Sequence, residues 1–405
     1  MFENKKIVLI VTGGVAAYKS ARVARLLIKA GAEVCVVMTK NALEFMTEKT
    51  FATLTKHAVL TDLFKTADAQ VAHIEWADWA DLLFVVPATA NFIGKLAQGL
   101  ADDAASTVAI ARHTPMLIAP AMNPAMYHNP AVRRNLAQLR QDGVMIIEPT
   151  EGLLAEGYQG QGRMLEPEEL LANAELQLRQ LMTQTPLQGQ KFLVTAGGTK
   201  EALDPVRFIG NHSSGKMGYA VAQALLEWGA DVTLITTVNL PSPAGVKMVP
   251  VQSAREMLVA LQADFAHVNG VVMAAAVADY RPLTVASKKI KKQSGANLAL
   301  TFQENPDLLA TLGQAKQHQI LVGFAAETND LIEHANLKLT KKNVDLLVAN
   351  DVTQPGSGFQ TDTNQVTFLQ PGLEPKTLPI LPKIEVARKI VQQIVQIQQE
   401  RRDIK

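Results

Sequence analysis

The sequence has almost no cysteine and almost no net charge, and both features limit the classes of protein to which it can belong. Cys35 is the single cysteine among 405 residues, so no disulfide can form within the chain. This fits a reducing compartment, and we expect a cytoplasmic protein. Cys35 lies in an apolar stretch and is expected to be an inert core thiol. Because the formal net charge is +1, no overall field attracts nucleic acid or an anionic membrane, and neither is expected as a partner.

The sequence also lacks a convincing signal peptide. Lys5 and Lys6 precede an apolar run, as in secretory signals, but the run is short and rich in β-branched residues. Gly13 and Gly14 then interrupt it. We therefore expect a first buried parallel strand.

Two segments of the chain, residues 5–39 and 190–237, begin in the same way. Each has an apolar strand, a glycine-rich turn, an amphipathic helix ending at Gly31 or Gly229, and a second apolar strand. The chain is too long for one core of roughly 150 to 250 residues. We predict an α/β fold of two doubly wound, Rossmann-like domains with mainly parallel sheets, 1–189 and 190–405. Their ligands should bind beyond the carboxyl ends of the strands.

The first turn, Thr12-Gly13-Gly14, does not have the spacing G-x-G-x-x-G. Its glycines would let backbone N–H groups approach a phosphate, and a mononucleotide such as FMN fits better than a dinucleotide; a plain tight turn is the alternative. The missing spacing also counts against a dinucleotide dehydrogenase. Hydroxyl and amide groups follow a later strand, at Thr89, Asn91, Ser106 and Thr107, and a lone histidine, ligand or structural, precedes that strand at His73.

Four motifs in residues 5–175 carry a family resemblance: "TGGVAAYK", "HIEWADWADLLFVVPATAN", "LADDAAST" and "PAMNPAMY". They resemble the flavin-dependent cysteine decarboxylases, above all the decarboxylase half of the bifunctional coenzyme A biosynthesis flavoproteins. The resemblance implies a flavodoxin-like domain that decarboxylates 4'-phospho-N-pantothenoylcysteine to 4'-phosphopantetheine. It implies FMN binding by Gly13, Gly14, Thr39, Thr89, Asn91 and Ser106, a base at His73, and substrate binding by Asn123, which holds the carboxylate, and Met126.

The glycine-rich stretch "EGLLAEGYQGQGRM", residues 151–164, is similar to the family's mobile substrate flap. Many relatives have a proton-donating cysteine where this chain has Glu156. A thiol with a pKa of about 8.5 keeps its proton at neutral pH, whereas a carboxyl near about 4.3 does not. Glu156 can donate a proton only if flap closure raises its pKa. Otherwise it is a solvated flap residue, and Tyr158, water or another group is the donor.

In the second half, "GNHSSGKM" nearly matches a P-loop, but Met217 replaces the residue that binds magnesium. The segment is either an unrelated turn or a helix N-terminus that directs Asn211, Ser213 and Ser214 at an anion. Further on, "ASKKIKKQ" is either a solvated basic loop or, with later lysines, a site for a triphosphate and Mg²⁺. The lysines concerned are Lys288, Lys289, Lys291, Lys292, Lys338, Lys341 and Lys342.

Residues 190–390 resemble the phosphopantothenate–cysteine ligase part of the same bifunctional family. The motifs are "TAGGTKEALDPVRFIGNHSSGKMG", "AAAVADYRP", "KIKK", "ENPDLL" and "GFAAETN". The resemblance implies a CTP-dependent ligase in which Asn211 acts on an acyl-cytidylate, Arg207 lies beside it, and Lys289 and Mg²⁺ offset phosphate charge. The implied CTP-binding residues are Asp279, Lys289, Asn305, Pro306, Asp307, Leu308, Phe324, Lys338 and Lys342.

We therefore predict a bifunctional enzyme with the substrates 4'-phosphopantothenate, L-cysteine and CTP. The resemblance implies a homo-oligomer, with trimers of the flavin domain and dimers of the ligase domain combining into a dodecamer. Three alternatives stay open at this point: a ligase whose flavin domain is impaired at Glu156, a flavin-binding regulatory or scaffold protein, and a dehydrogenase suggested by fold alone.

Overall fold

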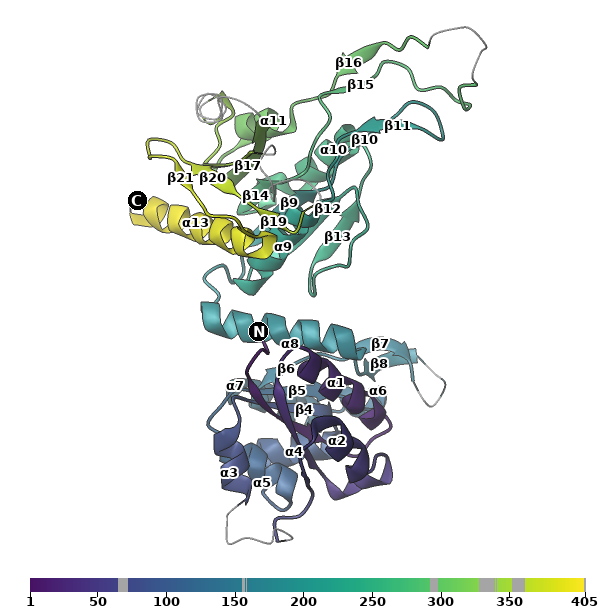
Figure 1. Cartoon of the computed structure of the whole chain (residues 1–405), viewed down its shortest axis with the longest axis vertical. Coiled ribbons are helices and arrows are strands. Elements are labelled where there is room, and N and C mark those ends of the chain that lie inside the picture. Colours follow the sequence, from purple (N-terminus) through teal and green to yellow (C-terminus); the bar gives the residue numbers. More distant parts are fainter. Residues whose placement is uncertain are drawn as a thin grey trace. The chain divides into compact units, whose positions relative to one another are not determined.

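The computed structural model describes residues 1–64, 72–154, 157, 159–291, 298–327, 339, 341–351 and 361–403. The chain forms two compact units, Met1–Leu178 and Arg179–Lys405, which Figure 1 colours from purple to blue-green and from teal to yellow. The division falls within helix α8 (Pro167–Thr183). The boundary at 189/190 stays a prediction. In the described parts of the chain, the helices are too short or too polar to cross a membrane.

The first unit contains a six-stranded parallel sheet in the order β3-β2-β1-β4-β5-β6. Strands β2 and β3 lie on one side of β1, and strands β4, β5 and β6 lie on the other side. The strand order therefore reverses between β1 and β4, which makes this position a topological switch point. The order is the 3-2-1-4-5-6 order of a doubly wound, Rossmann-like sheet, as predicted. The strands are β1 (Lys6–Val11), β2 (Glu33–Met38), β3 (Val59–Leu60), β4 (Leu82–Ala88), β5 (Met116–Pro120) and β6 (Met145–Ile146).

Successive residues of β1 belong alternately to two apolar clusters, so both faces of this sheet are buried, and helices cover both of them. Ile7 and Leu9 belong to one cluster, whereas Val8 and Ile10 belong to the other. A hairpin of β7 (Thr150–Leu153) and β8 (Gln159–Arg163) follows the sheet. The helices before α8 are α1 (Ala17–Lys29), the 3₁₀ helix η1 (Lys40–Glu44), α2 (Glu48–Thr55), α3 (Ala72–Trp79), α4 (Ala90–Gln98), α5 (Ala104–Ala111), α6 (Pro124–Tyr127) and α7 (Pro130–Gln141).

The second unit has an eight-stranded sheet in the order β13-β12-β9-β14-β17-β18-β20-β21. Its first six strands are parallel, and β20 and β21 add an antiparallel edge. The strands are β9 (Lys191–Ala196), β12 (Asp231–Thr236), β13 (Lys247–Pro250), β14 (Gly270–Met273), β17 (Ile320–Glu327), β18 (Leu346–Asp351), β20 (Val366–Leu369) and β21 (Lys376–Thr377).

The helices of this unit pack on its sheet, and α13 lies along α9 (Figure 1). The ladder of β15 and β16 projects away from the sheet, next to the ladder of β10 and β11. The helices are α9 (Lys216–Glu227), α10 (Ala254–Asp264), the 3₁₀ helix η2 (Phe265–His267), α11 (Leu308–Ala315) and α13 (Lys383–Asp403). The short strands are β10 (Lys200–Ala202), β11 (Phe208–Gly210), β15 (Tyr280–Pro282), β16 (Phe302–Glu304), β19 (Thr363–Asn364) and β22 (Leu381–Pro382).

The six parallel strands of the second sheet repeat the order of the first sheet, with β9 in the place of β1 and β14 in the place of β4. The duplicated opening of the two halves therefore extends through both parallel sheets. The predicted α/β class with mainly parallel sheets is confirmed.

Candidate functional sites

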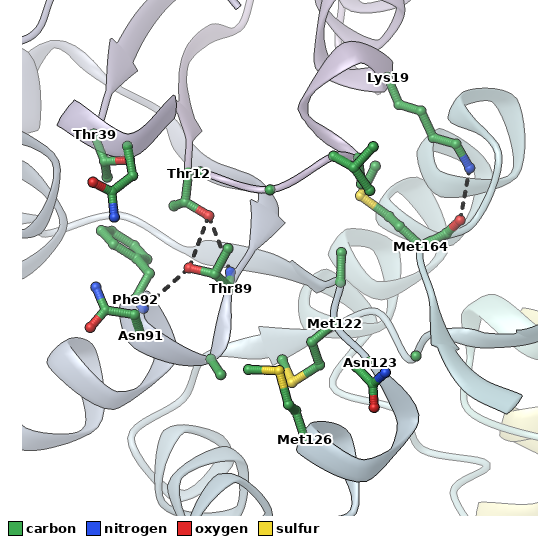
Figure 2. Close-up of a pocket in the computed structure, with 18 of the residues that line it drawn as sticks. Thr12, Lys19, Thr39, Thr89, Asn91, Phe92, Met122, Asn123, Met126 and Met164 are labelled. Carbon is green, nitrogen blue, oxygen red and sulfur yellow. Dashed lines mark hydrogen bonds between the residues drawn. The ribbon is translucent and has the colours of Figure 1, made fainter. Parts of the chain in front are cut away.

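The first unit contains a cavity of about 900 Å³ at its switch point, which we call the Thr12 cavity. Residues that follow the carboxyl ends of β1, β2, β4 and β5 line it, as expected for a doubly wound sheet. Its volume lies within the range of about 300 to 1,000 Å³ that is usual for small-molecule sites. Figure 2 shows Thr12 and Thr89 facing one another, with Asn123 and Met126 elsewhere along the wall.

Hydrogen bonds between the ends of β1 and β4 fix the centre of this cavity. The Thr12 hydroxyl donates to the Pro87 carbonyl at 2.8 Å and accepts from the Thr89 backbone N–H at 3.1 Å. The Thr89 hydroxyl in turn accepts from the Phe92 N–H at 3.4 Å and caps α4. The two strand ends and the start of α4 are thus held in one arrangement.

Thr39, which follows the end of β2, is a polar residue of the cavity wall. Its Oγ1 is buried and accepts or donates no hydrogen bond among the described residues, although the residue lines the Thr12 cavity. A buried hydroxyl in that state is costly unless a ligand completes its hydrogen bonding. The Thr39 hydroxyl is therefore a candidate hydrogen-bonding group for a ligand in this cavity.

The glycine-rich hairpin β7–β8 lies directly against the segment that carries Asn123. The Met122 N–H donates to the Gly162 carbonyl at 3.1 Å. Gly162 has φ +145°, and a Cβ there would lie 2.2 Å from the Met122 carbonyl oxygen. A Cβ on Gly160 would lie 2.5 Å from Cγ of Pro124. Glycine is required here by close packing. Glu156, between the two strands in the sequence, lies outside the described residues.

Two lysines in the cavity wall were not predicted from the sequence. Lys19, only 5% exposed, donates from Nζ to the Met164 carbonyl and to Glu166, both at 3.0 Å. This hydrogen bond is the main cause that lowers the pKa of Glu166. Lys95 pairs with Asp102 and Asp103 at 2.7 and 2.6 Å. Burial opposes its charge, but the two carboxylates raise the pKa of Lys95.

Most of the residues predicted for the flavin site lie in this wall, but two do not. Ser106 is fully buried and forms a capping box with Asp103 at the start of α5. His73 lies on α3 and does not line the cavity of its own chain. Asn123 caps α6 by accepting from the Ala125 N–H at 2.9 Å. The residues that line the cavity are Gly13, Gly14, Thr39, Thr89, Asn91, Asn123 and Met126.

The second unit contains two adjoining cavities beyond the carboxyl ends of β14 and β17. We call them the Asn305 cavity, of about 390 Å³, and the Asn211 cavity, of about 600 Å³. Ala275, Val277, Asp279 and Phe324 line both of them. The shared wall makes the two cavities one composite site.

The Asn305 cavity is held by a network around its polar loop. Asn305 donates from its amide to the Ala278 carbonyl at 2.8 Å and from its backbone to the Asp279 carbonyl at 2.7 Å. Asp307 pairs with Lys342 at 2.8 Å. Burial, the largest single cause, raises the pKa of Asp307, but the Lys342 interaction and backbone hydrogen bonds together outweigh it, so the pKa lies below its usual value. The predicted residues that line this cavity are Asp279, Asn305, Pro306, Asp307, Leu308, Phe324 and Lys342.

The Asn211 cavity contains the start of α9, including Ser213 and Ser214. The Asn211 side chain donates to the Val277 carbonyl at 3.1 Å. Gly215 precedes α9 with φ +78°, a conformation that glycine adopts without steric cost. The near P-loop motif therefore does form a turn into a helix N-terminus, and this turn borders a cavity.

Three residues predicted for the ligase site lie elsewhere or cannot be described. The Arg207 guanidinium pairs with buried Asp204, to which its Nε donates at 2.9 Å. The guanidinium also donates to the Ile290 carbonyl at 2.8 Å. This pairing with Arg207 lowers the pKa of Asp204. Lys289 is exposed near Ile290 and lines neither cavity. Lys338 lies outside the described residues. Among the described residues, no group of three or more His, Cys, Asp or Glu side chains could hold a metal ion.

Each unit thus combines a doubly wound sheet with a ligand-sized cavity at the carboxyl edge, which defines a two-domain α/β enzyme with a separate site on each sheet. Residues 1–176 match the family model described as "Flavoprotein". Residues 187–398 match the "DNA/pantothenate metabolism flavoprotein C-terminal domain".

Curated relatives match along nearly the whole chain. The coenzyme A biosynthesis bifunctional protein of Bacillus subtilis is 47% identical over 403 residues, covering 99% of each chain. The corresponding Escherichia coli protein is 42% identical over 398 residues, covering 97% of each. A crystal structure of the C-terminal domain of such a bifunctional protein is 41% identical, with a TM-score of 0.46, covering 53% of this chain and 99% of that one.

The chain belongs to the family of bifunctional coenzyme A biosynthesis proteins. The prediction of a bifunctional enzyme, with a ligase domain and a flavoprotein decarboxylase domain, is confirmed. The comparisons do not favour the alternative of a ligase with an impaired decarboxylase domain.

Proposed function

We propose that the second unit uses CTP to join L-cysteine to 4'-phosphopantothenate, and that the first unit uses FMN to decarboxylate the product to 4'-phosphopantetheine. The order of the reactions is then opposite to the order of the domains. The observation that carries this proposal is the clustering of predicted ligand residues around a cavity on each sheet: seven line the Thr12 cavity and seven line the Asn305 cavity. The single cysteine supports a cytoplasmic location.

The residues of the Thr12 cavity fit a flavin mononucleotide. Gly13 and Gly14 precede α1, at whose start backbone N–H groups favour a phosphate. The Thr39 hydroxyl, which has no hydrogen-bond partner among the described residues, offers a further hydrogen bond. Thr89 and Asn91 would contact the same ligand. Bound FMN supplies a reversible oxidation that allows loss of CO₂ without an unstabilised carbanion. We propose that Ser106 supports this site from the buried cap of α5.

Around the flavin, the chain's own side chains position the substrate and move protons. We propose that Asn123 binds the substrate carboxylate and that Met126 packs against the substrate, since both line the cavity. The hairpin β7–β8 would cover the site and exclude water. Because it packs so closely on Met122 and Pro124, a shift of the hairpin would be transmitted to Asn123.

We propose that His73 is the base and that it acts in the cavity of another copy of the chain. Its position outside its own cavity supports this arrangement, and so does the proposed trimer of the flavin domain. The final step of the decarboxylase reaction needs a proton donor. We propose either Glu156 or a substitute such as Tyr158 or water. Replacing Glu156 with Gln and finding unchanged turnover to the decarboxylated thiol would eliminate Glu156.

In the second unit, we propose that CTP binds along the Asn305 cavity, with Mg²⁺ held mainly by its phosphates. The carboxylate of 4'-phosphopantothenate attacks the α-phosphorus and pyrophosphate leaves. The cysteine amine then attacks the acyl carbon of the acyl-cytidylate, the bond to the phosphate oxygen breaks, and CMP leaves. Asn211 would act on that intermediate, since it lines the adjoining cavity. Lys289 and Lys338 would offset phosphate charge.

Lys289 and Arg207 line neither cavity of their own chain, and we propose that they act at the site of a second copy. Exposed apolar side chains near the ladders β10–β11 and β15–β16 support the proposed ligase dimer, because exposed apolar patches mark interaction surfaces. Such dimers and the trimers of the flavin domain would combine into a dodecamer. These exposed residues include Val206, Phe208, Leu283, Val285 and Phe302.

One reaction tests both activities: the purified protein with CTP, Mg²⁺, L-cysteine and 4'-phosphopantothenate, followed by mass spectrometry. Appearance of 4'-phosphopantetheine is the expected result. Accumulation of 4'-phospho-N-pantothenoylcysteine or its oxidised enethiol would mean that the ligase works and the decarboxylase is impaired at its flap. No cysteine adduct with CTP present would refute the proposed ligase reaction.

A further inference from the structure

The turn between β10 and β11 contains a buried carboxylate that none of the roles above uses. Asp204 is only 3% exposed, although carboxylates are seldom buried unless they are paired. Backbone hydrogen bonding closes the turn around it, since the Leu203 N–H donates to the Arg207 carbonyl at 2.9 Å. A carboxylate in such a place is stable only if donors surround it.

The donors to the Asp204 carboxylate come from two distant segments of the chain. Within the turn, the backbone N–H groups of Val206 and Arg207 donate to Oδ1 at 2.8 and 2.9 Å. The Arg207 guanidinium donates to Oδ2 from Nε at 2.9 Å. A further donor is the backbone N–H of Ile290, which lies 86 positions further along the chain and reaches Oδ2 at 3.1 Å. The carboxylate therefore joins the turn to the segment around Ile290.

Two more hydrogen bonds hold the same pair of segments together. Nη2 of Arg207 donates to the Ile290 carbonyl at 2.8 Å. The Ala286 N–H donates to the Leu203 carbonyl at 3.0 Å. The N–H of Ile290 is thus bound by Asp204, and its carbonyl is bound by the partner of Asp204. The peptide groups on both sides of Ile290 are therefore fixed in orientation.

The negative charge of Asp204 is what makes this arrangement strong. Hydrogen bonds from Arg207, followed by those from the backbone, hold the pKa of Asp204 well below its usual range, although burial opposes them. Hydrogen bonds to a carboxylate are roughly twice as strong as neutral ones. Asparagine has nearly the same size, but its NH₂ group can only donate and would face the donors that Asp204 now accepts.

The residue that precedes Ile290 is Lys289, whose side chain is exposed. We propose that Asp204 is a positioning residue for the ligation. Its carboxylate holds Lys289 and Arg207 as one unit, so that both reach the ligase site of a second copy in a fixed arrangement. This inference rests on the proposed roles of these two residues. Position matters to them because a displacement of about 1 Å can cost roughly 100-fold in rate.

The first test is a double-mutant cycle on the ligase reaction of the full-length protein, followed by release of CMP. Asp204→Asn should lower the ligase kcat by roughly 10- to 100-fold. In the Lys289→Gln and Arg207→Gln backgrounds, the same substitution should have a factor at least about threefold smaller, because one of the groups that it positions is already absent. A factor that is unchanged in the Lys289→Gln background would overturn the inference.

Hydrogen exchange followed by mass spectrometry tests the positioning without reference to activity. In Asp204→Asn, peptides that cover residues 286–291 should exchange faster, whereas peptides from β14 should be unchanged. Unchanged exchange at residues 286–291 would mean that Asp204 does not hold this segment, and would refute the inference. Decarboxylation of supplied 4'-phospho-N-pantothenoylcysteine should continue at the wild-type rate.

Asp345→Asn is the matched control for the loss of a paired carboxylate. The Asp345 side chain is 13% exposed, pairs with Arg401, and accepts from the Leu321 N–H at 2.8 Å. It precedes the amino end of β18, whereas the ligase cavities lie beyond the carboxyl ends of the strands. This variant should lose stability but retain the ligase kcat. An equal loss of kcat in Asp345→Asn would show that Asp204 acts only through stability, which would overturn the inference.

A second variant keeps the test decisive if Asp204→Asn does not fold. Ala286→Pro removes the N–H that donates to Leu203 and leaves the buried charge in place. It should also lower the ligase kcat and speed exchange at residues 286–291, and the absence of both effects would refute the inference. If Lys289→Gln retains full ligase activity, the proposed role of Lys289 fails. If Lys289→Gln is impaired but the two substitutions act independently, only the assignment of Asp204 fails.

Discussion

Replacing Thr39 with Val should change protein stability and flavin affinity in opposite directions. The Thr39 hydroxyl is buried without a hydrogen-bond partner among the described residues, and it lines the Thr12 cavity. Valine has nearly the same shape but no hydroxyl. In the flavin-free protein, the variant removes an unsatisfied polar group, so its free energy of unfolding should rise by about 1 to 3 kcal/mol.

In the flavin-bound protein, the same hydroxyl is proposed to contact FMN. Loss of a hydrogen bond to a charged group costs about 1.5 to 3 kcal/mol of binding free energy, which raises the dissociation constant for FMN by roughly 10- to 150-fold. Denaturant unfolding of the flavin-free protein measures the first effect. Titration of FMN, followed by quenching of its fluorescence, measures the second effect.

Thr114 provides a matched control for this experiment. Its hydroxyl is also buried without a partner among the described residues, but the residue does not line the Thr12 cavity. Thr114→Val should stabilise the flavin-free protein in the same way and leave FMN affinity unchanged. A Thr39→Val protein that is less stable without flavin, or that binds FMN as tightly as the wild type, would refute the reasoning.

Three further predictions follow from contacts within the two units. The Tyr127 hydroxyl donates to Glu148, and burial together with this contact raises the pKa of Tyr127 from 10.0 to about 12. The wild-type protein should therefore lose stability as the pH rises from 10 towards 12. Tyr127→Phe should lack that loss when unfolding is measured as a function of pH. Gly162→Ala forces a Cβ onto the Met122 carbonyl, so the decarboxylase KM should rise roughly tenfold, while unchanged ligase activity serves as the internal control. Lys342→Met should weaken CTP binding roughly tenfold in a CTP titration, and equal loss of CO₂ release would indicate a general folding defect.

The sequence predicted the architecture well because buried parallel strands have a strong local signal. The β-branched run of β1 and the glycine-rich turn after it indicate a βαβ unit without any knowledge of distant residues. The duplicated opening was visible for the same reason. Strand order is not local, however, and the reversal between β1 and β4 became clear only in the folded sheet.

The candidate sites were only partly predictable, because their remaining residues are defined by distant contacts. Lys19 binds the carbonyl of Met164, which is 145 positions away in the chain. Lys383, which lines the Asn211 cavity, follows directly after the ladder of β19 and β22. Neither lysine belongs to a motif with a local signature. By contrast, the glycines after β1 and the "ENPDLL" loop follow strands or begin helices, which are positions where ligand-binding residues are expected.

The burial of Cys35 has a consequence for chemical inhibition of this enzyme. Its thiol is 9% exposed, and burial, reinforced by Glu33, raises its pKa to about 11. Since thiolates are the form that reacts with electrophiles, the chain's single cysteine should resist alkylation at neutral pH. Iodoacetamide should therefore leave both activities intact, as followed by mass spectrometry of the protein and its products. Covalent compounds that depend on a flap cysteine would find no target in this chain, so selective inhibitors must bind reversibly or react with another side chain.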